Sequence, residues 1–490
     1  MPAQNFSAPL AIRGRVAYNG IRLNMRFSGI EDRKVKPLMN QKKEALTEGP
    51  LTPKIVRFIL PLMATGILQL LYNAADSIVV GRWESTNALA AVTSVGSLIN
   101  LLVNVFMGLS VGTSVAVAHD YGAKDYEGVS RTVHTSYLVS FIGGVFVSAV
   151  GMIFSRQFLI WMQSDPAVLP LSTEYLRIYF VGTTANMAYN FGASVLRSVG
   201  DTRRPLYFLS ISGLANVILN MIFVIVFHMG VAGVAWATVI SQILSAVFVI
   251  VYMMRSRDCI RFEWKKLKIH PDKLKKIVTV GLPAGFQGTV FSISNVIIQS
   301  SVNSFGALVM AGNGAAASIE GFTYIAMNSV YHASLTFVGQ NVGARRLDRI
   351  NKVVFRCLVI VTVIGLAFGI VSYLLAEPLL AIYLPEAPDA IAFGKIRMLY
   401  IVLPYFLCGM MEVMVGGQRG MGLSLIPMIN ALIGSCLLRI VWIATVFAAH
   451  HTLFMLYISY PISWFVTTIA HSIVYGIKLH KLKQEDYIHG

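Results

Sequence analysis

The chain has 490 residues, of which 56% are hydrophobic and only 13% are charged. A soluble globular protein carries about 25% charged residues, so composition excludes an ordinary soluble domain and indicates a polytopic membrane protein. The net charge of +17 does not indicate nucleic acid as a partner, because the basic residues lie in short loops between apolar segments. Neither a disulfide framework nor a zinc site is expected, because the four cysteines are scattered without a CxxC pair.

The first segment, residues 1–49, is polar and basic and lacks both helical periodicity and the apolar core of a signal peptide. We expect it to be a disordered extension. The sequence MNQKKEALTEG at 39–49 is typical of a bacterial start, so residues 1–38 could also derive from an upstream start codon.

Twelve apolar segments follow, each long enough for the roughly 20 residues that a membrane-spanning helix requires. They predict an all-α polytopic membrane protein with twelve transmembrane helices. The predicted spans are 55–80, 88–117, 132–154, 173–196, 206–228, 233–254, 277–302, 309–339, 353–375, 395–416, 425–447 and 453–477.

Lys and Arg residues concentrate in one set of loops, which includes the connection 255–276, whereas the opposite loops contain only Arg82 and Arg156. Cytoplasmic loops carry the excess of positive charge in membrane proteins. We therefore expect both termini to be cytoplasmic, in a bacterial cytoplasmic (inner) membrane.

The two halves of the chain resemble each other at offsets of 221 or 222 residues, which indicates a duplication of six helices. Because six is even, both halves insert in the same orientation, giving two six-helix bundles related by a pseudo-two-fold axis along the membrane normal, with substrates bound between them. The matches are LPLMATG (60–66) with LPAGFQG (282–288), YGAKDYEGVSRTV (121–133) with VGARRLDRINKVV (342–354), and RSVGDTRRP (197–205) with RGMGLSLIP (419–427).

This duplication predicts a domain plan. The N-lobe (helices 1–6) is expected at 50–255, the cytoplasmic linker at 256–276, the C-lobe (helices 7–12) at 277–478 and a cytoplasmic tail at 479–490.

An acidic residue, Asp76, lies inside the first predicted span, in LLYNAADSIVVG. A charged residue in a span costs at least a few kcal/mol and marks a candidate functional site. The equivalent position in the second half is Ile298, so the fold does not require an acid there.

Three further polar residues of the same half could accompany Asp76. Asn216 and Asn220 lie four residues apart and share a helix face, and Thr238 lies in the next span. Their oxygen atoms suit a hard cation such as Na⁺, which would be the only metal site expected. Alternatively, Asp76 carries a proton, or the group only forms hydrogen bonds between helices.

The second half has its own acids, Glu320 and Glu412, whose first-half equivalents are not acidic. They could bind protons or cationic substrate, or simply form interhelical hydrogen bonds. Tyr72 and Met411, near Asp76 and Glu412, are candidates for an adaptable substrate pocket.

Prolines and glycines inside the predicted spans indicate where helices bend or pack closely. Pro61 in the first span permits a kink and is a candidate hinge, and Pro283 occupies the equivalent place in the second half. The GxxxG spacing at Gly281 and Gly285 indicates close helix packing.

The sequence contains no phosphate-binding loop, nucleophile elbow or metalloprotease helix, so we do not expect an enzyme. An ion-coupled carrier needs none of these motifs, and we expect no cofactor besides its coupling ion, H⁺ or Na⁺.

These features together resemble the multidrug and toxic compound extrusion (MATE) transporters over residues 50–478, with forms closest to the bacterial DinF- and MepA-like branch. The stretches that carry the resemblance are LPLMATGILQLLYNAADSIVVG, VLRSVGDTRRPL, NVILN, MGVAGVAWATVISQ, GLPAGF, FVGQNVGARRLDRI and QRGMGLSLIPM.

The resemblance implies a monomeric rocker-switch exporter of amphipathic and cationic compounds, driven by inward Na⁺ or H⁺. Asp76 matches the family's coupling aspartate, Pro61 its helix-bending proline, and Asn216 and Thr238 two members of its N-lobe cation site. Asn220 departs from the pattern, because it stands where the family has a second acid.

That departure weakens the case for Na⁺ and favours a proton. Some branches also carry acids in the seventh and tenth helices, where this chain has Phe291 and Cys408. Glu412 lies one turn beyond Cys408 and could substitute.

Two other functions stay open at this point. A flippase for lipid-linked precursors, found in the wider superfamily, would favour a strongly cationic cavity, whereas these spans contain acids. A membrane scaffold without transport would tolerate neutralisation of all three acids.

Overall fold

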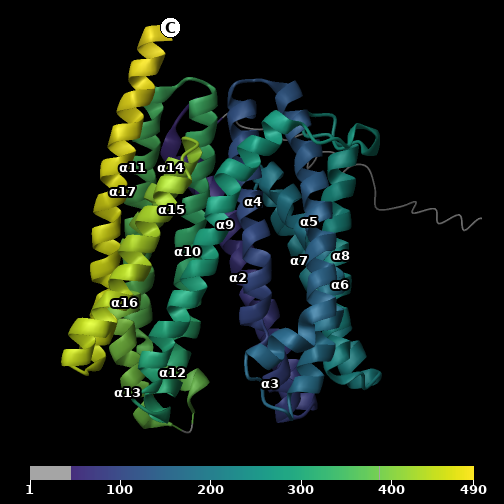
Figure 1. Ribbon diagram of the computed structural model, residues 1–490, viewed down its shortest axis with the longest axis vertical. Helices are drawn as coiled ribbons and strands as arrows, with labels where there is room; N and C mark the ends of the chain where they lie inside the picture. The colour runs from purple at the N-terminus through teal and green to yellow at the C-terminus, as the bar shows by residue number, and fades with distance from the viewer. Residues whose placement is uncertain (1–45, 386, 490) are drawn as a thin grey trace, which may run out of the picture. The chain divides into compact units, whose positions relative to one another are not determined.

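The computed structural model describes residues 46–489 except residue 386 (Figure 1). Nearly all of the predicted N-terminal extension therefore lies outside the described residues. Every regular element in the described part is helical, and no strand occurs there. This confirms the all-α fold class and follows from the apolar segments, because only helices or closed barrels satisfy backbone hydrogen bonds in lipid.

The first half forms six long helical segments. Asn220 ends the fifth as a regular α-helix, and the chain continues for one wider π-helical turn. The elements are α2 (Leu51–Trp83), α3 (Thr86–Ser94), α4 (Gly96–Gly122), α5 (Tyr126–Trp161), α6 (Leu169–Ser198), α7 (Arg203–Asn220), η1 (Met221–Val226) and α8 (Gly230–Arg255).

The second half repeats this plan after a short 3₁₀ turn, η2 (Trp264–Lys266), in the linker. Its elements are α9 (Pro271–Asn303), α10 (Ala307–Gly343), α11 (Leu347–Leu374), α12 (Ala376–Tyr383), α13 (Pro388–Arg397), η3 (Met398–Val402), η4 (Leu403–Tyr405), α14 (Phe406–Gly420), α15 (Leu425–Ala431), η5 (Leu432–Leu437), α16 (Leu438–Trp442), η6 (Ile443–Phe447) and α17 (Leu453–His489).

Ten helical segments in the described part of the chain are long and apolar enough to cross a membrane. The other two predicted spans correspond to α6 and α10, which have 30 and 37 residues but carry more polar side chains. The two together with the ten give the twelve predicted helices. Several helices run beyond the predicted limits, and α17 continues through most of the predicted tail, because charged residues at a helix end can extend into water.

Glycines let α4 and α9, which belong to different halves, come into backbone contact. A Cβ placed on Gly108 would lie 2.1 Å from the backbone nitrogen of Gly285. A Cβ on Gly281 would lie 2.6 Å from Leu109 Cα, and one on Gly112 would lie 2.1 Å from Ile277 O. Small residues at such positions are the usual means by which membrane helices approach closely.

The helix α2 packs against both halves. Ile55, Phe58 and Ile59, near its start, belong to the main apolar cluster of the second half, where the Phe58 and Phe337 rings meet edge to face at 5.6 Å. Val79 and Val80, near its end, belong instead to a first-half cluster. Pro61 lies within the first of these contact regions, next to Leu62, which also belongs to the second-half cluster.

We predict that Gly281→Ala lowers the thermal unfolding temperature of the purified protein. The added methyl group must displace the backbone of α4, and overpacking of this kind costs roughly 1–3 kcal/mol. Gly288→Ala is the matched control, because a Cβ there meets only the Asn104 side chain, at 3.7 Å or more. Equal unfolding temperatures for the two variants would contradict the assignment of Gly281 to a backbone contact.

Candidate functional site

The predicted N-lobe site forms at one end of α2, where it meets α7. The Asn220 side-chain amide donates a hydrogen bond to Asp76 Oδ1, and its second contact is Asn216 Oδ1, at 3.4 Å. Asn220 is fully buried and Asn216 is 5% exposed. The structure thus brings together three of the four residues that the sequence proposed for cation coupling.

The orientation of the Asn220 amide affects what the cluster can bind. Its NH₂ group faces the Asp76 carboxylate, whereas its own Oδ1 is buried and has no hydrogen-bond partner among the described residues. The cluster therefore has one carboxylate stabilised by an amide donor, an arrangement that suits a carboxyl group that gains and loses a proton. No group of three or more His, Cys, Asp or Glu side chains in the described part of the chain could hold a metal ion.

Two other predicted residues lie on the helices around this cluster. Thr238, on α8, donates its hydroxyl to Val234 O at 3.0 Å within its own helix. The Tyr72 ring packs directly on Gly213 of α7, and its hydroxyl donates to Ser210 O at 3.2 Å. Tyr72 thus joins α2 to α7, and its contact with substrate stays a prediction.

The π-helical turn η1, which begins directly after Asn220, is not special to the Asp76 cluster. The equivalent residues of the second half form another π-helical turn, η6, at Ile443–Phe447. Because the second half has Ile298 where the first has Asp76, this local widening belongs to the duplicated fold.

The Pro61 region of α2 stays helical in this structure. Thr65 Oγ1 donates to Pro61 O at 2.7 Å, and a Cβ on Gly66 would lie 2.5 Å from the Ile325 side chain of α10. The proposed hinge therefore lies beside a contact between the two halves.

Glu320 is engaged in an ion pair that the sequence analysis did not identify. Arg397 contacts Glu320 Oε2 at 2.5 Å and donates from its other terminal nitrogen to Asn313 Oδ1 at 2.7 Å. The hydroxyl of Tyr457 reaches the same Asn313 oxygen at 3.2 Å. The sequence did contain an indication of this pair, because Arg397 also lies in a predicted span. It could not show which acid Arg397 contacts, because the two residues are far apart in the chain.

Glu412 differs from Glu320, because it forms no hydrogen bond or ion pair with another described residue. Its neighbour Met411 is 2% exposed, and the Met411 sulfur accepts from Ser435 Oγ at 3.3 Å. Met411 therefore packs inside the second half. Cys408, one turn before Glu412, is buried as well.

A second set of functional candidates, missed by the sequence analysis, joins the two halves. His119 Nε2 donates to Gly420 O at 2.7 Å, and Gln340 Nε2 donates to Ser198 O at 2.7 Å. His119 and Gln340 are equivalent in the duplication, and so are Ser198 and Gly420. The two hydrogen bonds are therefore a reciprocal pair, each running from one half to the other.

Glycines allow the backbones to meet at the same level. A Cβ on Gly122 would lie 2.0 Å from Gln340 O, and one on Gly343 would lie 2.0 Å from His119 O. The repeated spacing was visible as HDYG and QNVG, a long polar side chain three residues before glycine in both halves. We call the four residues of the two hydrogen bonds, together with these two glycines, the reciprocal latch.

An ion-pair cluster beside the reciprocal latch has no symmetric copy. Asp120 contacts Lys273 Nζ at 2.8 Å and Lys276 Nζ at 3.6 Å, and it accepts from Thr132 Oγ1 at 2.8 Å. The residue equivalent to Asp120 is Asn341, whose amide donates to Phe337 O within its own helix. The cluster ties α4 and α5 to the start of α9.

A family model described as MatE matches residues 61–222 and again residues 283–445, one match in each half of the duplication. Among curated proteins, the chain is 28% identical to the probable multidrug resistance protein YoeA of Bacillus subtilis, over 80% of this chain and 85% of that protein. It is 25% identical to the probable multidrug resistance protein NorM of Thermotoga maritima, over 79% of this chain and 83% of that protein.

A crystal structure of MATE in the bent conformation has the same fold, with a TM-score of 0.83 at 24% identity, covering 91% of this chain and 99% of that chain. The two matched segments 61–222 and 283–445 make up more than half of the 490 residues. The protein therefore belongs to the MatE family.

Proposed function

We propose that this membrane protein is a multidrug efflux antiporter, a carrier and not an enzyme, that exports amphipathic and cationic compounds in exchange for an inward cation. We place it in the bacterial cytoplasmic membrane with both termini in the cytoplasm, as a monomer. The family and the multidrug resistance relatives YoeA and NorM support this function. The observation that carries the coupling is the buried Asn220–Asp76 hydrogen bond on a helix that packs against both halves.

The coupling ion proposed here is the proton. Asp76 is the only carboxylate of its cluster, and the Asn220 amide donates a hydrogen bond to it. A Na⁺ ion would need several oxygen ligands in place of that donor. A protonated carboxyl group, in contrast, keeps an acceptor oxygen for Asn220 and has no charge to bury.

The proposed mechanism is alternating access, in which the two lobes rock around a central substrate site. Proton binding at Asp76 changes how the end of α2 is held against α7, while the start of α2 stays packed on the second half. A bend near Pro61 would let the two ends move separately. Coupling requires that the proton and the substrate bind the two states of the carrier with different affinities.

The reciprocal latch would then be the closed cytoplasmic gate. It lies at the helix ends that adjoin the basic loops, which the positive-inside rule assigns to the cytoplasm. Opening toward the cytoplasm must break both hydrogen bonds and separate the glycine contacts between the lobes.

We expect Asp76→Asn to abolish ethidium efflux from cells while the amount and unfolding temperature of the protein stay normal. The substitution keeps the shape and a hydrogen-bonding oxygen but removes the titratable group. Ser77→Ala is a matched control on the same helix, because Ser77 donates only to Asn73 O of α2, at 3.1 Å. Efflux at the wild-type rate by Asp76→Asn would sink the proposed role.

Glu320→Gln serves as a contrast to that experiment. It removes one partner of a buried ion pair, which costs roughly 3–5 kcal/mol, so this variant should lose thermal stability. If Asp76→Asn lost as much stability as Glu320→Gln, then Asp76 would be a structural residue.

A disulfide between α4 and α10, which belong to different halves, tests alternating access. A Cβ on Gly339 would lie 2.9 Å from Ala118 Cβ, so a small separation of the two helices brings the pair into the range of about 3.5–4.5 Å found in disulfides. In a variant with the native cysteines replaced by serine, Ala118→Cys with Gly339→Cys should form a cross-link on oxidation. Transport in inverted vesicles should stop on oxidation and return with dithiothreitol.

The single variant Gly339→Cys controls for oxidant damage and for the added side chain. If the fully cross-linked double variant transported substrate as fast as it does after treatment with dithiothreitol, a gate at this contact between α4 and α10 would be contradicted.

A further inference from the structure

The linker between the lobes lies as an ordered strap on α5 and α8. Phe262 is 1% exposed, and its ring lies 4.6 Å from that of Tyr137 and 4.9 Å from that of Trp264. The Phe262 backbone N–H donates to Met253 O at 3.2 Å, near the end of α8. We call residues 256–270 the linker strap.

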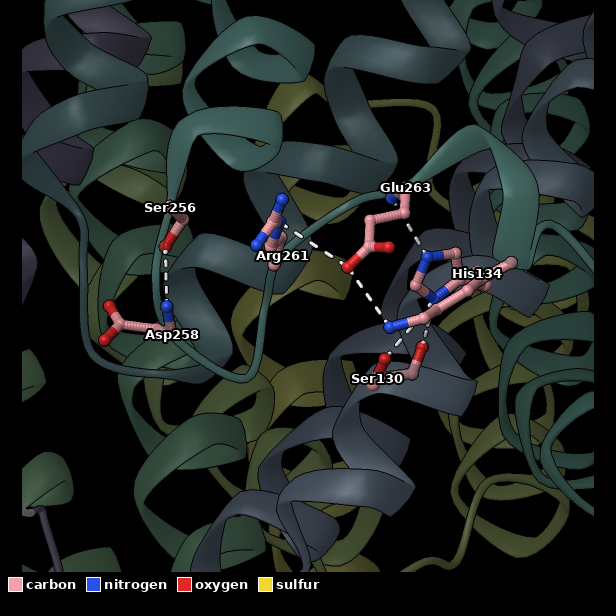
Figure 2. A network of polar contacts seen from close by, with 7 residues as sticks. Ser130, His134, Ser256, Asp258, Arg261 and Glu263 are labelled. Atoms are coloured by element: carbon pink, nitrogen blue, oxygen red, sulfur yellow. Dashed lines mark hydrogen bonds and ion pairs between the residues drawn. The ribbon is translucent and has the colours of Figure 1, made fainter. Parts of the chain in front are cut away.

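Polar contacts fix the linker strap in register, as Figure 2 shows around His134. The N–H of Glu263 donates to His134 Nε2 at 3.1 Å, and His134 Nδ1 lies 2.7 Å from Ser130 O. Because a carbonyl only accepts, the His134 proton is on Nδ1. On the same helix, Thr135 Oγ1 donates to Lys268 O at 3.3 Å and accepts from the His270 N–H at 3.1 Å.

Trp264 of the linker strap packs on the membrane-spanning helix α5. Its ring stacks on Phe141 of α5 with a centroid distance of 5.8 Å and an interplanar angle of 16°. Phe141 lies on α5, whose 36 residues make it about 54 Å long, so the helix extends beyond the hydrocarbon core of about 30 Å. Trp264 is nevertheless 53% exposed and Ile269 is 37% exposed. Exposed indole side chains beside membrane-spanning helices are typical of the boundary between headgroups and acyl chains.

Cations surround this apolar surface. Glu263 is the nearest acid on the strap, and the hydrogen bond from Lys266 lowers its pKa, so it is ionised and pairs with Lys266 at 3.1 Å and Arg261 at 3.5 Å. Lys273 and Lys276 are turned toward Asp120 instead. The exposed cations of the region are Arg255, Arg257, Arg261, Lys265, Lys266, Lys268 and Lys275.

We propose that the linker strap is a binding surface for anionic phospholipid headgroups, with Trp264 inserted at the acyl boundary and the exposed cations on the phosphates. Charge complementarity supports this occupant, since basic clusters directly adjoining a membrane helix attract anionic lipid. The exposed indole of Trp264 beside these cations favours a lipid over a soluble anion, because a lipid adds an apolar contact. Because the contacts of His134, Thr135 and Phe262 hold the linker strap on α5 and α8, the surface is already formed before lipid binds.

The test uses the full-length protein in vesicles that contain phosphatidylethanolamine and phosphatidylglycerol in equal amounts, with bromine on the acyl chains of one lipid at a time. Bromine quenches tryptophan fluorescence at short range. The chain has six tryptophans, so the signal of Trp264 is taken as the difference between the wild type and Trp264→Phe. We expect brominated phosphatidylglycerol to quench Trp264 about twofold more than brominated phosphatidylethanolamine, because the anionic lipid is enriched at the strap.

Neutralising Arg257, Lys265 and Lys268 to glutamine should remove this preference while quenching by brominated phosphatidylethanolamine remains. Trp161, 67% exposed at the far end of α5, is the control and should show equal quenching by the two lipids. Equal quenching of Trp264 by both lipids in the wild type would overturn the headgroup preference. Absence of any Trp264 quenching would overturn the contact with lipid itself.

Discussion

The hydrogen bond from Asn220 to Asp76 is the interaction on which the proposed coupling depends. A carboxylate inside an apolar helix bundle is costly, and here one buried amide, which also contacts Asn216, donates a hydrogen bond to it. The bond joins the end of α2 to α7, while the start of α2 packs on the second half. A change in the protonation of one carboxyl group can therefore alter the packing of a helix that both lobes share.

Features that occur in both halves and features that occur in only one half have different proposed roles. The reciprocal latch, with its two glycines, and the paired π-helical turns obey the duplication, as expected of parts that let two similar lobes close on each other. The Asp76 cluster and the Glu320–Arg397 pair do not, because each occurs in one lobe only. In the proposed mechanism, the duplicated frame supplies the motion, and residues particular to one lobe supply the chemistry.

Much of the fold could be predicted from the sequence, because twelve apolar runs and three colinear matches leave few alternatives. The Asp76 cluster could also be predicted, because ionisable and amide groups are rare in spans and the i, i+4 spacing of Asn216 and Asn220 places both on one helix face. Roles for Tyr72, Met411, Glu412 and Thr238 stay predictions, although the packing of Tyr72 and Met411 within their own lobes is now defined.

Sequence could not reveal pairs that depend on how distant helices are rotated. Arg397 follows Glu320 by 77 positions, and only the packing of α10 against α13 brings them together. The reciprocal latch was hidden for another reason: His119 and Gln340 are chemically different, although both present an N–H donor to a carbonyl. The order in the linker strap was also missed, because its contacts come from single side chains such as Phe262 and not from periodicity.

The most direct measurement of the coupling is substrate transport by the purified protein in proteoliposomes, with a pH gradient and a Na⁺ gradient imposed separately. If protons are the coupling ion, the pH gradient alone drives substrate against its own concentration gradient and the Na⁺ gradient alone does not. Uphill transport driven by Na⁺ at uniform pH, or substrate movement only down its own gradient, would contradict the proposed proton coupling through Asp76.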